Sequence, residues 1–223
     1  MNNVVELAIS RFKDKLRETR LASDADSISA VIHLAAERAT EPREVYAFSH
    51  PVEVASLLLG IIHEAEAVTK EVIMAAFVCH TGLTIQDVET RVDRETTSKV
   101  FSLANSSKLA EIGEDSVVET ILLFLADKLC ALRHNYLYNR SQQKAMARAV
   151  KKKLEKCPVM HPWSVNCWVR ELLRLSNVCL GIVFNAAETK ELVGQEASGN
   201  VVPIKQAGGQ VGTKAAIDQA ATG

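Results

Sequence analysis

Apolar residues recur at helical spacing along nearly the whole chain, and runs that alternate apolar and polar residues, as strands do, are absent from the sequence. The spacing predicts a first helix over about 4–20 and a second after the capping cluster "SDADS". One face of the second helix collects Ile28, Val31, Ile32, Ala35 and Ala36. We therefore predict an all-α fold.

The stretch "HPVEVASLLLGIIHEA" predicts a third helix. Proline is tolerated at the first helical position, so Pro51 should begin this helix, with His50 at or just before the N-cap. A fourth helix is predicted over 69–80. The segment "TIQD", 84–87, is a variant capping box that opens a fifth helix only three residues later. His80 therefore lies at a helix end, where an imidazole can also serve the helix dipole and the free carbonyls.

The segment 116–135 is apolar almost all round, which is typical of a helix in the middle of a bundle. Asp127 interrupts its apolar character. An unpaired buried carboxylate is costly, so Asp127 must have a partner: a metal, a basic side chain or several hydrogen-bond donors. A basic helix over about 140–156 and a long last helix over about 162–185 follow.

The character of the chain changes near residue 187. The segment 187–223 has no aromatic residue and holds six of the ten glycines. We therefore expect one helical domain over 1–186 and a flexible tail over 187–223.

Composition and charge limit the classes of function. A net charge of −1 argues against a general nucleic-acid or anionic-membrane binder, so any basic patch must be local. The five cysteines are odd in number and form no CxxC pair, which favours a reducing compartment. The sequence shows neither a leader pattern at its start nor a membrane span of about 18 apolar residues. We expect a soluble cytoplasmic protein.

Four motifs, in order over 46–135, resemble those of HD-type phosphohydrolases, above all the alarmone hydrolase domain of RelA/SpoT proteins and their small single-domain relatives. "YAFSHPVEVASLLLG" resembles "YxxHPxxVAxxL", and "IMAAFVCH" resembles "xxAALLHD". "TIQDVETRV" is similar to the helix "TxEDIxxxF", and "LLFLADKLCALRHN" is similar to "xxKLADRLxNLR". The resemblance implies an HD-domain-like helical bundle.

The resemblance also implies a divalent metal, most often Mn²⁺, that polarises a phosphate and activates a water. By position, His50 matches the first ligand and Asp127 the last. The middle ligands come from a His-Asp doublet, and two alignments are open here. Either Cys79 takes the histidine position and His80 the aspartate position, or His80 keeps the histidine role and Thr81 replaces the aspartate. The predicted metal ligands are His50, His80 and Asp127.

The chain departs from the family pattern after His80. Only "TGL" stands where alarmone hydrolases carry a loop with a Glu-Asp pair for the attacking water. The sequence is therefore compatible with two functions. The first is a metal-dependent hydrolase of a nucleotide, alarmone-like phosphate ester. The second is a catalytically inactive HD-fold protein that binds a nucleotide or a protein partner in a regulatory role; a homo-oligomer is compatible with either. Alarmone synthesis is not expected, because the family's synthetase region is missing.

Five residues are candidates for binding the phosphate or the rest of a substrate. Arg43 precedes the "HP" motif at nearly the distance of a nucleotide-binding arginine of the family, and Arg38 is the alternative. Lys128 and Arg133 follow the "LAD" aspartate as a basic residue and an arginine do in the family motif. His134 lies two helical turns after that aspartate, on the same face, and can border the site.

The basic helix holds seven lysines and arginines and one acid over 140–156. Because these residues occur at mixed helical phases, we favour a solvated surface over a nucleotide or RNA site.

Overall fold

The computed structural model describes residues 3–38, 42–109, 117–155 and 163–181, and these parts of the chain form helices and turns without a strand. The prediction of an all-α fold is confirmed. The predicted tail, 187–223, lies outside the described residues. No described helix combines the length and the apolar character needed to cross a bilayer.

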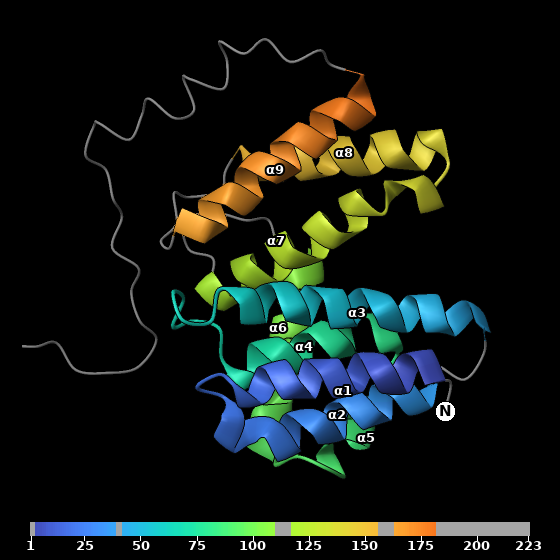
Figure 1. The fold of residues 1–223 in the computed structure, drawn as a ribbon. Helices are drawn as coiled ribbons and strands as arrows, with labels where there is room; N and C mark the ends of the chain where they lie inside the picture. The colour runs from blue at the N-terminus through green and yellow to red at the C-terminus, as the bar shows by residue number, and fades with distance from the viewer. Residues whose placement is uncertain (1–2, 39–41, 110–116, 156–162, 182–223) are drawn as a thin grey trace, which may run out of the picture.

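The helices follow one another as α1 (Asn3–Arg17), the 3₁₀ turn η1 (Ala22–Asp24), α2 (Ala25–Arg38), α3 (Pro42–Gly60), α4 (Lys70–Thr81), α5 (Ile85–Glu89), α6 (Arg94–Leu109), α7 (Val118–Arg133), the 3₁₀ turn η2 (Asn135–Leu137), α8 (Arg140–Leu154) and α9 (Trp163–Leu180). In Figure 1, α1 and α2 lie on one side of α3 and α4, while α7 and then the α8–α9 pair lie on the other. The bundle is therefore built in layers around α3, α4 and α7.

The core is centred on α4, in which every residue from Val72 to Cys79 is buried. This helix packs against α2, α3, α6 and α7, which explains why no single face of it could remain polar. Its Phe77 ring meets Phe12 of α1 edge-on at 5.7 Å between centroids and Phe48 of α3 at 6.2 Å. These three rings tie α1, α3 and α4 together.

The predicted start of the third helix is wrong. Helix α3 begins at Pro42 and continues through Pro51, so His50 lies within the helix rather than at its N-cap. A proline inside a helix removes one backbone hydrogen bond. Packing compensates, because Phe48, Pro51 and Ala55 are all buried.

Helix α6 was not predicted. It begins after Asp93, whose Oδ1 accepts a hydrogen bond from the Thr96 amide at 2.9 Å, as an N-cap residue does. Its buried positions include Thr97, Val100 and Ala104. Polar residues on the buried face concealed its helical period.

The other predicted helices are found within a few residues of their expected bounds. Thr84 and Asp87 form the predicted capping box, with both reciprocal hydrogen bonds present. Helix α8 begins after a second capping box, made by Asn139 and Gln142. Helix α9 ends before Gly181, which has a φ of 73° and so adopts the left-handed conformation that glycine favours at a helix end.

Candidate metal centre

Three side chains from three helices meet at the interface of α3, α4 and α7. His50 lies within α3, His80 lies in the last turn of α4, and Asp127 lies in the middle of α7. One possible ligand atom from each residue falls within 4.8 Å of the other two. The structure thus brings together the three residues that the sequence predicted as metal ligands, although 47 or more positions separate Asp127 from the other two.

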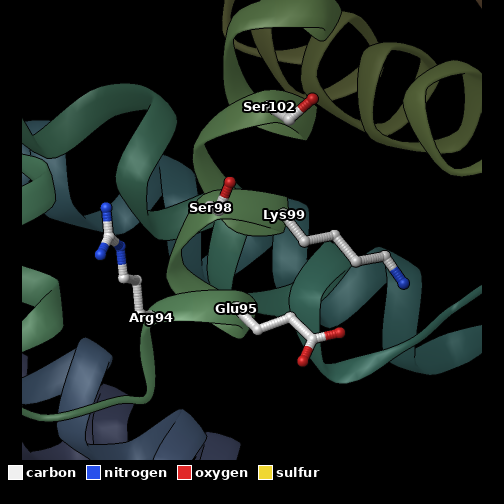
Figure 2. Close-up of a pocket in the computed structure, with 5 residues that line it drawn as sticks. All are labelled: Arg94, Glu95, Ser98, Lys99 and Ser102. Atoms are coloured by element: carbon white, nitrogen blue, oxygen red, sulfur yellow. The ribbon is translucent and has the colours of Figure 1, made fainter.

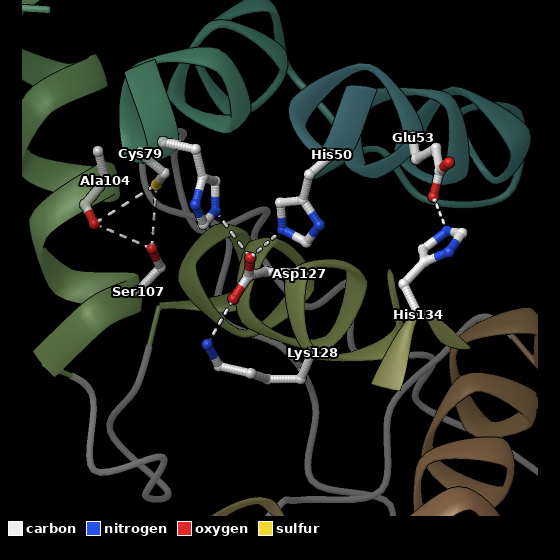
Figure 3. A network of polar contacts seen from close by, with 9 residues as sticks. His50, Glu53, Cys79, Ala104, Ser107, Asp127, Lys128 and His134 are labelled. Atoms are coloured by element: carbon white, nitrogen blue, oxygen red, sulfur yellow. Dashed lines mark hydrogen bonds and ion pairs between the residues drawn. The ribbon is translucent and has the colours of Figure 1, made fainter. Parts of the chain in front are cut away.

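The Asp127 carboxylate is the centre of this cluster (Figure 3). Its Oδ1 lies 2.8 Å from His50 Nε2 and 2.7 Å from His80 Nε2. Its Oδ2 accepts a hydrogen bond from Lys128 Nζ at 2.6 Å. The two imidazole rings meet edge to face, 4.5 Å apart at an interplanar angle of 82°. Asp127 therefore has three basic partners, as its burial requires.

The environment keeps Asp127 ionised. Burial alone would raise the pKa of its carboxyl group, but the hydrogen bonds from His50 and His80 and the nearby Lys128 ammonium together hold that pKa well below its ordinary value. The side chain of Asp127 is only 13% exposed. A negative charge is thus kept at a site that little water reaches.

Cys79 and His80, the two alternatives for the histidine of the predicted doublet, point to different helices. The Cys79 thiol points to α6, where it lies 3.6 Å from the Ala104 carbonyl oxygen and 3.5 Å from Ser107 Oγ (Figure 3). His80, one residue later, is turned by about 100° around the helix axis and reaches Asp127. His80 is therefore the residue of this pair that joins the cluster.

In the alignment that keeps His80 as the histidine, Thr81 stands at the aspartate position, and its side chain does not replace a carboxylate. Its hydroxyl donates a hydrogen bond to the Phe77 carbonyl within α4 at 2.8 Å. Helix α4 ends directly afterwards, because Gly82 has a φ of 66° and serves as a left-handed C-cap. This termination places His80 at the surface end of the helix.

A second acid–base pair connects α3 with the C-terminal end of α7. His134 Nε2 lies 2.7 Å from Glu53 Oε2, and His134 Nδ1 lies 3.2 Å from the Tyr136 hydroxyl. Figure 3 shows this pair beside the cluster, with Glu53 on the helix that carries His50. Within the described part of the chain, His134, predicted to border the site, thus forms hydrogen bonds with Glu53 and Tyr136 and with none of the three cluster residues.

Sequence reasoning missed Glu53. The signal was present, because Glu53 follows His50 by three residues and so lies on the same helix face. Cys130 is buried on α7, between Asp127 and His134 in the sequence. Burial raises the pKa of its thiol to about 12, and the negative charges of Glu53 and Asp127 contribute to this shift. Cys130 therefore stays a thiol at neutral pH and is a poor metal ligand.

The remaining candidates for phosphate binding are distributed differently. Lys128 belongs to the cluster through Asp127. Arg38 forms an ion pair with Asp87 at 2.8 Å, at the corner of α2 and α5. Arg133 is exposed in the last turn of α7. Arg43 lies in the first turn of α3, but its side chain falls outside the described residues.

An open hollow of about 680 Å³ lies elsewhere, along α6. Figure 2 shows the residues that line it, with Arg94, Ser98 and Ser102 following one another at four-residue spacing. None of the three cluster residues lines this hollow. It is an open surface of one helix and does not extend the candidate metal centre.

The three cluster residues suit a divalent first-row ion. One possible ligand atom of each residue lies within 4.8 Å of the other two, so a single ion could contact all three. Two imidazoles and one carboxylate are a ligand set for Zn²⁺, Fe²⁺ or Mn²⁺, and three protein ligands leave positions open for water or substrate. Lys128 occupies Oδ2, so Asp127 offers one oxygen.

Comparison of the chain with family models, with curated proteins and with solved structures finds no match. The geometry of His50, His80 and Asp127 is therefore the observation on which a function can be based.

Proposed function

We propose that His50, His80 and Asp127 hold a divalent metal ion in an HD-type phosphohydrolase site that acts on a nucleotide phosphate ester. The convergence of three ligand atoms within 4.8 Å carries the proposal. The order of the four HD-like motifs along the chain supports it, because the residues that meet are those that the resemblance implies as ligands.

A bound divalent ion would polarise a phosphoryl oxygen and lower the pKa of a bound water. The protein's own groups complete the site. His50 and His80 orient their Nε2 atoms toward the same oxygen of Asp127. Lys128 holds Asp127 from the other side and, because it is one-third exposed, places a positive charge where a phosphate can approach.

The Glu53–His134 pair provides a nearby group that can hold and transfer a proton. The 2.7 Å contact between Glu53 Oε2 and His134 Nε2 resembles the carboxylate–imidazole pairing of general acid–base sites. Both side chains are more than a third exposed, so substrate or water can reach them. In this proposal the pair serves the role for which alarmone hydrolases carry a Glu-Asp loop.

One observation favours a second candidate, an HD-fold protein that binds a nucleotide without turnover. The position of the doublet aspartate is taken by Thr81, whose hydroxyl is bonded to its own helix. Loss of one carboxylate weakens the affinity of the site for a divalent ion.

Metal analysis of the purified protein, combined with a screen of nucleotides for hydrolysis in Mn²⁺, tests the proposal. We expect about one ion per chain, turnover of a nucleotide, and loss of both in Asp127→Ala. The matched control is His63→Ala, because His63 is an exposed imidazole in the turn after α3. Metal at 100 times its dissociation constant should also stabilise the wild type by about 2.7 kcal/mol.

The two candidates predict different results in the same experiment. Bound metal with turnover supports the hydrolase. A nucleotide that raises the melting temperature without turnover or bound metal supports the inactive binder and refutes the enzyme. Equal metal binding by wild type and Asp127→Ala would refute the assignment of the ligands.

A further inference from the structure

Helix α8 concentrates positive charge in one part of the molecule. It carries six basic residues and no acidic one, on a chain with a net charge of −1. The helix forms an outer layer with α9, on the far side of α7 from α3 (Figure 1). A segregated charge of this kind creates a local potential that the net charge does not reveal.

The structure divides the six basic residues into two sets. Two of them turn toward the bundle: Lys151 Nζ donates to Asn177 Oδ1 at 3.3 Å, and Lys153 Nζ lies 4.9 Å from the centroid of the Phe124 ring. These contacts occupy both side chains in packing α8 against α9 and α7.

The other four, Arg140, Lys144, Arg148 and Lys152, follow one another at intervals of four residues. This spacing places them in one row that is about 18 Å long and winds slowly around the helix. Arg140, Arg148 and Lys152 are exposed, and Lys144 is half-buried. Within the described part of the chain none of the four forms an ion pair. Among the described residues the row is thus a line of positive charge without an ion-pair partner.

Two exposed tyrosines and an exposed leucine stand at the beginning of the row. Tyr136, Leu137 and Tyr138 are 69%, 56% and 39% exposed. The turn that presents them is fixed, because Gln143 Nε2 donates to the Tyr138 carbonyl at 2.8 Å and the capping box of Asn139 follows at once. Their exposure therefore belongs to an ordered turn.

We propose that the row of four basic residues, together with Tyr136 and Tyr138, binds single-stranded nucleic acid. Lysine and arginine in a line follow a phosphodiester backbone, and exposed aromatic rings stack on bases without regard to sequence. An anionic membrane fits less well, since a helix that lies on a bilayer needs large apolar side chains along its length, whereas the exposed Leu137 stands only before the start of α8. The positions between the charges on the exposed face are instead Ser141, Ala145 and Ala149. The row on α8 shares no residue with the candidate metal centre, although the Tyr136 hydroxyl lies 3.2 Å from His134 Nδ1.

Fluorescence anisotropy with labelled U12 and dT12 tests the inference, because the two oligonucleotides distinguish RNA from DNA. For a single strand, each phosphate contact contributes about −0.7 to the slope of log K against log salt concentration. Four contacts give a slope of about −2.8, so affinity should fall about 50-fold between 50 and 200 mM salt. Binding of either oligonucleotide with this slope supports the proposal.

The variant Lys144→Gln/Arg148→Gln should reduce the slope by about 1.4. The control Arg11→Gln/Lys15→Gln makes the same change in net charge on the exposed face of α1 and should leave the slope unchanged. Tyr138→Ala should weaken binding about tenfold with no change in slope, because stacking releases no counterions. Circular dichroism verifies that each variant is folded.

Three outcomes overturn the inference. The first is no binding of either oligonucleotide at 50 mM salt. The second is an equal loss in the α1 control, which would indicate a response to net charge alone. The third is binding to phosphatidylserine vesicles without binding to either oligonucleotide, which would assign the row to a membrane surface.

Discussion

Replacing Asp127 by asparagine should make the stability of the protein less sensitive to acid. The wild-type carboxylate accepts hydrogen bonds from His50, His80 and Lys128, and its pKa in the folded protein is strongly lowered. A group of this kind contributes stability that is fully present above its unfolded pKa of about 3.9 and is lost as the pH falls below it. Asparagine keeps the shape of the side chain but removes this titration.

The size of the effect follows from linkage. If the folded pKa lies well below 3, protonation of the unfolded chain reduces the free energy of unfolding by about 1.3 kcal/mol at pH 3. At pH 7 the variant should be less stable by about 2 kcal/mol. That figure is below the 3 to 5 kcal/mol typical of a broken buried pair, because His50, His80 and Lys128 are 23%, 31% and 33% exposed and can turn to water.

Urea unfolding followed by circular dichroism, from pH 7 to pH 3 in metal-free buffer, measures both numbers. The difference between wild type and Asp127→Asn should shrink by about 1.3 kcal/mol over this range. Asp14→Asn is the control, since the Asp14 side chain is 65% exposed and forms only a surface pair with Arg17. Parallel loss of stability in wild type and Asp127→Asn would refute the idea that the three donors keep this carboxylate charged.

Three further substitutions test the fold around the site by urea unfolding. Arg20→Met should lower the free energy of unfolding by about 2 kcal/mol, because the Arg20 guanidinium donates to four backbone carbonyl oxygens of the turn after α3. The control Arg11→Met, on the exposed face of α1, should leave it almost unchanged, and equal losses in the two variants would contradict this role of Arg20. Gly82→Ala should cost about 1 to 2 kcal/mol because its φ is 66°, whereas Gly60→Ala, with an ordinary φ and open space around it, should be neutral or slightly stabilising; the reverse order would be inconsistent with the left-handed C-cap. Thr84→Ala should cost about 1 kcal/mol through loss of the capping box, and an unchanged unfolding midpoint would show that the cap contributes nothing.

Sequence patterns predicted those elements whose apolar period was clear. Helices α4 and α7 and the cap of α5 lie within two residues of their predicted positions. Helix α6 was missed because its buried face includes Thr97 and Ser107, whose polar side chains break the apolar period. The start of α3 was misplaced because tertiary packing overrides the local preference of Pro51.

The candidate site could be predicted only in part. Helical period shows that Asp127 is buried and needs partners, but it gives no relative position for residues on different helices. The resemblance to HD proteins supplied the other members, His50 and His80. The choice between Cys79 and His80 depended on the acceptors that α6 offers to the thiol, and no local pattern encodes those.

The cluster of the Phe12, Phe77 and Phe48 rings has a consequence for the candidate metal centre. Phe77 precedes His80 by less than one turn on α4, and Phe48 precedes His50 by two residues on α3. The rings thus set the spacing between the backbones that carry the two imidazoles. A smaller residue at position 77 would let these helices settle toward each other, so a change that touches none of His50, His80 and Asp127 would alter the spacing of the two imidazoles.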